Sequence, residues 1–168
     1  MNFHLMPIAL KPLQPTDMEF ARSVYNYYVL NTTATFHTEP VTLAAFAAAL
    51  PMNHSLYQSY LIIYGDKPCG YAYLGNWKPR QAYNRSAEVT IYIEKDFHGK
   101  GIGKQSLMFL EAEARKRKIK NLLGVITFEN KASIHLFEKA GFQKVGHLKN
   151  IGEKFGRLLD VVTYQKEI

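Results

Sequence analysis

Three glycines alternate with other residues near the middle of the chain, in the run His98-Gly99-Lys100-Gly101-Ile102-Gly103. Glycine in such alternation indicates that the backbone turns where a Cβ would clash, or that it closely approaches another molecule. The run stands between a predicted strand and a predicted helix, and the first amides of a helix form an anion site that the helix dipole strengthens. Lys100 and Lys104 add positive charge beside it. The pattern therefore predicts a phosphate-binding turn.

Two common phosphate-binding fingerprints do not fit this turn. A nucleotide P-loop that began at Gly99 would need its second glycine where Lys104 stands. The dinucleotide fingerprint Gly-x-Gly-x-x-Gly fits at Gly99 and Gly101 and fails at its third position, which is again Lys104. The residues alone leave a different phosphate ligand, or a glycine-rich connection that binds no ligand.

Other residues that could do chemistry argue against several kinds of site. The six histidines are scattered, and none stands at ligand spacing from another His, Cys or Glu, so we predict no metal site. The one cysteine, Cys69, cannot form an intramolecular disulfide. Because no histidine is close to it in sequence, we predict a packed thiol rather than a nucleophile.

The composition is typical of a globular protein. Of 168 residues, 47% are hydrophobic and 21% are charged, and no apolar run is long enough to cross a bilayer. With no signal-peptide pattern at the start, we expect residues 1–168 to form one cytoplasmic domain without a membrane partner. The net charge of +7 suits a phosphate-rich cofactor or a nucleic acid. The basic run at 115–118 is typical of a solvated helix end and no nucleic-acid motif is present, so we predict no nucleic-acid partner.

The hydrophobic pattern predicts strands and helices that would position these residues. We expect strands at 8–13, 60–64, 69–77, 88–93, 122–127, 142–148 and 158–164, and helices from 16, at 43–50, 103–116 and 132–140. A capping box at Thr16 and Glu19 is predicted to start the first helix, whose core face would carry Phe20, Val24 and Tyr27 or Tyr28. This order predicts a mixed sheet with helices packed on its faces.

The ordered set of segments resembles the GNAT-superfamily acetyltransferases. The strand at 88–93, the turn and the following helix resemble that family's acetyl-CoA site, whose motif is Gln/Arg-x-x-Gly-x-Gly/Ala. The Gly101-Ile102-Gly103 core matches the motif, and His98 departs from its first position. Segments 130–133 and 138–142 resemble the family's second cofactor segment. Segments 34–36, 70–72, 80–83, 87–93 and 152–156 narrow the likeness to the phosphinothricin and methionine-sulfoximine acetyltransferase subgroup, over nearly the whole chain.

This resemblance implies a fold and an activity. The expected fold is α/β (α+β), with a mixed, mostly antiparallel central sheet flanked by helices on both faces. The expected activity is transfer of acetyl from acetyl-CoA to the amino group of a small amino-acid-like acceptor, by direct attack in a ternary complex. A homodimer is expected. The alternatives are a non-catalytic acyl-CoA-binding or regulatory domain and a GNAT enzyme for an unrelated amine.

The resemblance also assigns Glu88 as the general base. An aliphatic amine is mostly protonated at neutral pH and must lose a proton before it attacks a thioester. A carboxylate does this better when partial burial raises its pKa. The resemblance also implies the cofactor contacts. The backbone of Tyr92 and Ile93 would bind pantetheine, and the side chains of Asn130 and Ser133 would bind the far side of the cofactor. The pyrophosphate would be held by the glycine turn, which consists of His98, Gly99, Lys100, Gly101, Ile102, Gly103 and Lys104.

The predicted acceptor contacts are Phe36, Arg80, Tyr83 and Arg85. Arginine binds a carboxylate through two parallel hydrogen bonds, and aromatic side chains wall a small-molecule pocket. A flexible basic loop without a ligand is the alternative for residues 77–85.

Two departures from the family pattern bear on mechanism. Phe137 occupies the helix position at which many GNAT enzymes carry a tyrosine that protonates the leaving thiolate, and phenylalanine has no proton to donate. His135 is a weak substitute, because residues two apart on a helix point to different faces. The segment 157–160 lacks the tryptophan that is usual in the subgroup. Phe137 is the reason for retaining the alternative of a domain that binds acyl-CoA without turnover.

Overall fold

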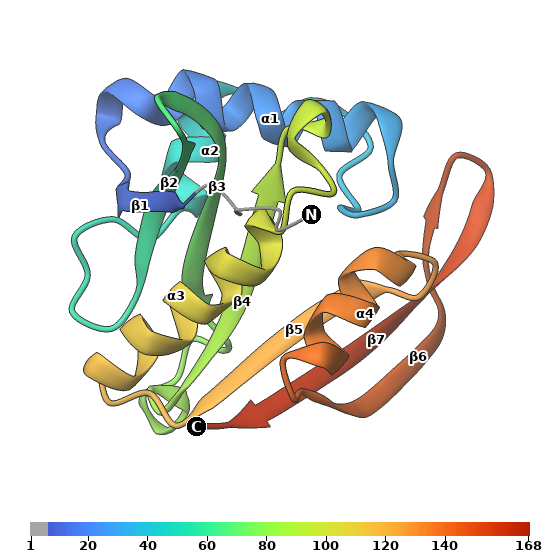
Figure 1. The fold of residues 1–168 in the computed structure, drawn as a ribbon. Coiled ribbons are helices and arrows are strands. Elements are labelled where there is room, and N and C mark those ends of the chain that lie inside the picture. The colour runs from blue at the N-terminus through green and yellow to red at the C-terminus, as the bar shows by residue number, and fades with distance from the viewer. Residues whose placement is uncertain (1–6) are drawn as a thin grey trace, which may run out of the picture.

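The computed structural model describes residues 7–168, and in this range seven strands form one sheet (Figure 1). The strands are β1 (Ile8–Pro12), β2 (Gln58–Tyr64), β3 (Lys67–Asn76), β4 (Ser86–Ile93), β5 (Asn121–Thr127), β6 (Gln143–Lys154) and β7 (Arg157–Glu167). The helices are α1 (Met18–Asn31), α2 (Leu43–Ala49), α3 (Ile102–Lys116) and α4 (Lys131–Lys139), with single 3₁₀ turns η1 (Pro15–Asp17), η2 (Gln81–Tyr83) and η3 (Lys95–Phe97).

The sheet order is β1-β2-β3-β4-β5-β7-β6, and it divides into two antiparallel halves. Strands β1 to β4 pair antiparallel in sequence order, and β5, β7 and β6 do the same on the other side. The two halves meet only where β4 and β5 pair in parallel, over Ser86–Glu88 and Asn121–Leu123. Beyond these residues the two strands spread apart (Figure 1).

Helices cover both faces of the sheet, as expected. On one face, Val24 of α1 and Phe46 of α2 pack with Tyr71 of β3. On the other face, Leu110 of α3 and Phe137 of α4 belong to the larger core cluster. The mixed, mostly antiparallel sheet with helices on both faces confirms the predicted fold class.

The start of the first helix differs from the prediction. The capping box lies two residues earlier, at Gln14 and Asp17, because Pro15 opens a 3₁₀ turn that runs into α1. The Gln14 amide donates to Asp17 Oδ2 at 2.9 Å, while Glu19 pairs with Arg22 instead of reaching back to Thr16. Of the two alternatives for the core face, Tyr28 is half-buried and Tyr27 is exposed.

The last two strands are longer than predicted. The pairing of β6 with β7 continues through Gly152↔Leu159 and Lys154↔Arg157 to a tight turn at Phe155 and Gly156, which both have positive φ. Most of the added β6 residues are exposed, so hydrophobic alternation does not reveal them. The turn is of the kind that matches strand twist in a two-residue hairpin, and it extends the ladder beyond the core.

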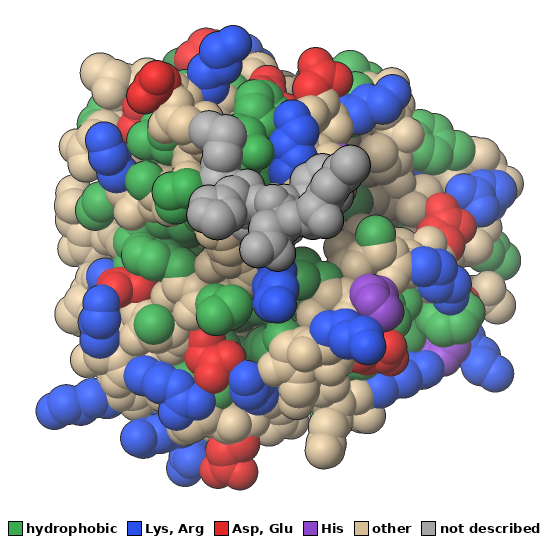
Figure 2. Space-filling model, in the orientation of Figure 1, with side chains coloured by type: hydrophobic (Ala, Val, Ile, Leu, Met, Phe, Trp, Pro, Cys, Tyr) green, Lys and Arg blue, Asp and Glu red, His purple; other side chains and the backbone are tan. Residues whose placement is uncertain are grey.

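Basic and acidic side chains are interspersed on the face of the molecule that Figure 2 shows. In the basic run, Arg115 pairs with Glu111 at 2.8 Å and Lys116 with Glu113 at 2.6 Å, which fits a solvated helix end. Among residues 7–168, no helix combines the length and the apolarity that a membrane crossing requires.

Candidate active site

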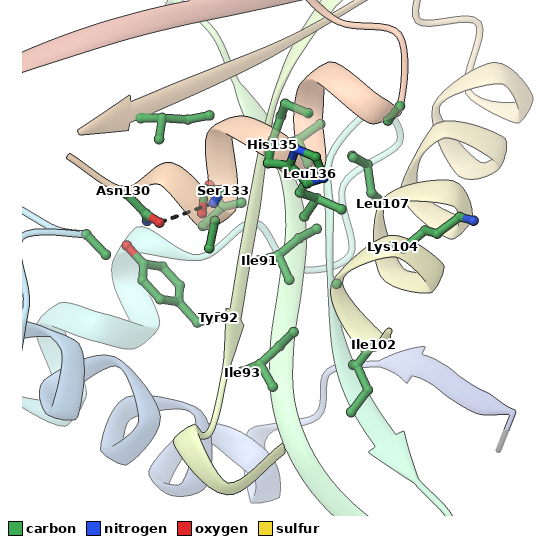
Figure 3. Close-up of a pocket in the computed structure, with 18 of the residues that line it drawn as sticks. Ile91, Tyr92, Ile93, Ile102, Lys104, Leu107, Asn130, Ser133, His135 and Leu136 are labelled. Carbon is green, nitrogen blue, oxygen red and sulfur yellow. Dashed lines mark hydrogen bonds between the residues drawn. The ribbon is translucent and has the colours of Figure 1, made fainter. Parts of the chain in front are cut away.

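A groove of about 1160 Å³ opens where β4 and β5 separate, between the two halves of the sheet. Its walls come from β4, β5, α3, α4 and the loop after α1. Because side chains alternate along a strand, β4 gives its two faces different roles. Ile91 and Ile93 are partly buried and pack against the core cluster under α3, whereas Tyr92 packs on the α1 side, and these directions are visible in Figure 3.

The glycine turn forms the start of α3 and lies open at the groove. Gly99 and Gly101 both have φ near +75°, a left-handed conformation that disfavours residues with a Cβ. A Cβ added at Gly99 would have no neighbour within 4 Å, so side chains do not cover this part of the turn. The amides of residues 102–104 belong to the first helical turn, whose N–H groups have no partner inside a helix. The turn can therefore bind a diphosphate through backbone donors.

Six of the seven residues predicted for this turn line the groove, and Lys100 does not. Its ammonium lies 4.9 Å from the centre of the Phe97 ring and 5.5 Å from that of Tyr64. The contribution of Lys100 is therefore limited to charge near the turn, while Lys104 lines the groove directly (Figure 3).

The backbone of β4 departs from the predicted pantetheine contacts. The Glu94 amide donates to Cys69 O of β3 at 2.8 Å, so by alternation the Tyr92 backbone also faces β3, and only its ring lines the groove. Ile91 and Ile93 present their backbone groups to the open side. Ile93 O already accepts from Tyr28 Oη and lies 3.0 Å from His98 Nε2, which leaves its amide and the Ile91 backbone for a ligand.

Glu88 lies at the last paired position of β4, where the groove begins. Its side chain lines the groove, and burial raises the pKa of the carboxyl above its ordinary value, while the charge of Lys78 acts in the opposite direction. A raised pKa makes the carboxylate a better proton acceptor for an ammonium group. The predicted base therefore stands in a site that suits it.

The N-terminus of α4 closes the far side of the groove. Asn130 caps the helix, and its Oδ1 accepts from the Ser133 amide at 3.2 Å (Figure 3). Both residues line the groove, so capping and ligand contact are compatible. His135 also lines it, although the sequence favoured another face of the helix. Phe137 is buried, and its ring fills the space in which a Cβ on Gly124 would stand.

The predicted acceptor residues are not brought together. Phe36 lines the groove, but Arg80, Tyr83 and Arg85 do not. The loop that carries them precedes β4 at the end where β4 and β5 are still paired, and the Arg85 carbonyl accepts from the Lys120 and Asn121 amides there. This backbone role holds the start of β5 and keeps Arg85 away from the open end of the groove.

Sequence reasoning missed a group of hydroxyls on the Glu88 side of the groove. Tyr25, Tyr28, Thr35 and Tyr73 line it. Tyr25 Oη lies 2.6 Å from Thr35 Oγ1 and 2.5 Å from His37 Nδ1. In the sequence these residues appear as a helix face, a loop and a buried strand, and only the repetition of tyrosine hints at a polar wall.

Cys69 is fully buried on β3 and does not line the groove. Burial raises the pKa of its thiol to about 11, which suppresses the nucleophilic thiolate. The packed thiol that the sequence predicts is confirmed.

Comparison with known proteins shows the family to which the chain belongs. The acetyltransferase (GNAT) domain family matches residues 10–163. An L-methionine sulfoximine/L-methionine sulfone acetyltransferase of Pseudomonas aeruginosa is 32% identical over 164 residues, which cover 95% of this chain and 94% of the relative. A phosphinothricin N-acetyltransferase of Streptomyces viridochromogenes is 28% identical, over 96% of this chain and 88% of its own.

Comparison with solved structures points to the same family. The phosphinothricin acetyltransferase of Sinorhizobium meliloti, determined in complex with acetyl-CoA, superposes with a TM-score of 0.89 at 28% identity, over 97% of this chain and 89% of its own. The open amides of the turn, the free edge of β4 and the size of the groove suit the same ligand here. The chain therefore belongs to the GNAT acetyltransferase family and is an acetyl-CoA-dependent N-acetyltransferase.

Proposed function

We propose that this protein acetylates the amino group of a small amino-acid-like acceptor, with Glu88 as the general base and without a covalent enzyme intermediate. The observation that carries the proposal is that Glu88 lines the groove at the point where β4 and β5 separate. The nonpolar cofactor side lies on one face of β4, and the hydroxyl-lined side lies on the other. The acceptor class follows the two curated relatives, which act on methionine sulfoximine, methionine sulfone and phosphinothricin.

In this mechanism the chain binds, orients and moves a proton. The first-turn amides of α3 hold the pyrophosphate, and the backbone of Ile91 and Ile93 holds the pantetheine arm as an added strand. Bound acetyl-CoA supplies the thioester. Glu88 takes a proton from the acceptor ammonium, so that the neutral amine attacks. Phe137 has no proton to give, so the leaving thiolate takes its proton from another hydroxyl of the groove or from solvent.

The acceptor carboxylate needs a cation on the Glu88 side. The histidines and lysines that line the groove are His98, Lys104, His135, Lys139 and Lys166, which belong to the α3 turn, to α3, to α4 and to β7. Lys78 is the cation whose charge reaches Glu88. Lys78, on the loop before η2, is therefore our candidate for the acceptor carboxylate.

Thiol release in the presence of acetyl-CoA tests the acceptor class. Methionine sulfoximine, methionine sulfone and phosphinothricin should each be assayed against unrelated amines such as spermidine and a peptide N-terminus. Turnover with the first group supports the proposal. Release of thiol only with the unrelated amines would reject the amino-acid-like acceptor and leave the family assignment intact.

The variant Glu88→Gln tests the base. Removal of a general base lowers the rate by about 10²- to 10⁴-fold, and acetyl-CoA binding should be unchanged because the carboxylate does not contact the turn. Glu94→Gln is the matched control, since Glu94 follows β4 at its other end and does not line the groove. Full activity of Glu88→Gln would show that the base is another residue.

The family resemblance also leads us to expect a homodimer in the cytoplasm. Light scattering at assay concentration measures the assembly.

A further inference from the structure

The two halves of the sheet are hydrogen-bonded to each other over only three residue pairs, at the closed end of the groove. At the open end, the loop at 32–38, which follows α1, lies beside the tip of the β6–β7 hairpin (Figure 1). The loop belongs to the N-terminal half and carries Ala34, Thr35 and Phe36, all of which line the groove. Contacts between this loop and the C-terminal half therefore bridge the open end.

Lys154 makes the most unusual of these contacts. It ends β6 and is only 3% exposed, yet it is a lysine. Its Nζ donates to the Thr35 carbonyl at 2.8 Å, and burial lowers the pKa of this ammonium. A buried charge is costly unless it is well paired, and replacing one by an apolar side chain of similar volume is often neutral for stability. Stability alone is therefore a weak reason for a lysine here.

A second set of bonds holds the same loop from β5 and the turn that follows it. Thr127 Oγ1 donates to the Thr33 carbonyl, and Thr33 Oγ1 donates to Glu129 Oε1 at 2.7 Å. Arg157 of β7 binds both carboxylate oxygens of Glu129 at 3.0 Å. The loop is thus tied to two strands of the C-terminal half as well as to Lys154.

The Phe36 ring completes the connection. It packs on Gly152 of β6 so closely that a Cβ at residue 152 would overlap it. The ring therefore sits between the hairpin and the groove, and the position of the hairpin sets the position of this wall.

We propose that Lys154 is a positioning residue that fixes the acceptor wall of the groove by holding the Thr35 carbonyl across the divided sheet. It touches neither Glu88 nor the glycine turn, so it acts on the acceptor through the loop at 32–38. The expected effect of Lys154 on acceptor binding rests on the proposed function, because that proposal defines which side of the groove binds the acceptor.

Amide hydrogen exchange tests whether the bond from Lys154 to the Thr35 carbonyl holds the loop, and it needs no acceptor substrate. Lys154→Met keeps much of the side-chain volume and removes the donor, and Lys149→Met is the control, because Lys149 is exposed on the same strand. We expect the peptide that covers residues 32–38 to exchange about tenfold faster in Lys154→Met, as suits the loss of a charge-assisted hydrogen bond. Equal exchange in the two variants would overturn the proposal.

Steady-state kinetics with methionine sulfoximine as the probe tests the consequence. In Lys154→Met, the KM for methionine sulfoximine should rise about tenfold, while the KM for acetyl-CoA stays within twofold, because the loop supplies neither the amides of the glycine turn nor the free edge of β4 that are proposed to hold acetyl-CoA. A general disturbance of the fold would raise the KM for both substrates. Equal changes in both KM values would contradict a positioning role.

If Lys154→Met does not fold, Lys154→Gln decides the question. Glutamine keeps a polar side chain but is shorter and uncharged, so it loses the ammonium that donates to the Thr35 carbonyl. Faster exchange at 32–38 and the same KM split are expected, and their absence would overturn the proposal. If the wild-type protein does not acetylate methionine sulfoximine, the proposed acceptor class fails. The exchange experiment then still decides the role of Lys154.

Discussion

The environment of single residues determines what chemistry the groove can do. Glu88 is raised in pKa by burial rather than by a neighbouring anion, and the nearest influence of opposite sign is Lys78. Phe137 offers no hydroxyl, but its ring fills the space left by Gly124 and joins the core. The proposed base is thus a carboxyl whose pKa is raised by burial, and Phe137 contributes packing rather than a proton.

The pKa of Glu88 predicts a pH dependence of both rate and stability. The rate should rise with pH as the carboxyl ionises through its raised pKa. Between the ordinary value of about 4.3 and the raised one, the folded state binds the proton that the unfolded state has lost, so the Glu88 contribution to stability falls as pH rises. Glu88→Gln should therefore melt at or above the wild-type temperature at pH 8, with a smaller difference at pH 4. Lower stability of Glu88→Gln at pH 8 would contradict a carboxylate that burial penalises.

Gly124 is predicted to be intolerant of a side chain. In Gly124→Ala, the new Cβ meets the rigid Phe137 ring, and overpacking of this kind costs about 1–3 kcal/mol. Thermal unfolding measures the loss, and the double variant Gly124→Ala/Phe137→Leu should recover part of it. If the double variant loses the sum of the two single effects, the two residues are not in contact.

At the scale of elements, the geometry of β4 and of the α3 start explains the cofactor site. One strand edge is free because β5 leaves it after three residues, and one helix starts on two left-handed glycines. Both arrangements leave backbone groups without partners, and these groups are what a pantetheine chain and a diphosphate can use.

A matched pair of glycine variants separates strain from binding. Gly99 and Gly156 have φ of +76° and +69°, and neither has an atom within 4 Å of an added Cβ. Alanine at either position should cost a similar amount of stability, about 1–2 kcal/mol. Only Gly99→Ala should weaken acetyl-CoA binding, by about tenfold or more, as isothermal titration would measure. Equal affinities of the two variants for acetyl-CoA would place the pyrophosphate elsewhere.

At the scale of the whole molecule, acetyl-CoA bound in the groove would connect two halves that share only three residue pairs of the sheet. Acetyl-CoA in the groove would contact β4 and α3 on one side and α4 on the other. Binding to the native state alone stabilises it according to the free ligand concentration relative to Kd.

Acetyl-CoA should therefore raise the melting temperature in a concentration-dependent way. At 100 times Kd the gain is about 2.7 kcal/mol, which for a chain of this size corresponds to roughly 5–11 °C. Glu88→Gln should show the same shift, because its carboxylate does not hold the cofactor. A melting temperature that does not respond to acetyl-CoA would contradict binding in the groove.

Much of this architecture could be predicted from local pattern. The order of strands and helices, the glycine turn, the Asn130 cap and the packed Cys69 are consequences of short-range chemistry, because they depend on residues within a few positions of one another. The errors have local causes too. Pro15 moved the first cap, and the exposed part of β6 carries no hydrophobic alternation.

The sequence by itself determined the family, the acetyl-CoA cofactor and the position of Glu88 on its strand. Only the tertiary structure decided which groups share the groove. It turned the Tyr92 backbone to β3, kept Arg80, Tyr83 and Arg85 outside, and brought Lys154 against a loop 119 residues away in sequence. The reason is physical: strand pairing and the buried contacts that close a divided sheet join residues far apart in the chain, and no spacing between neighbours encodes them.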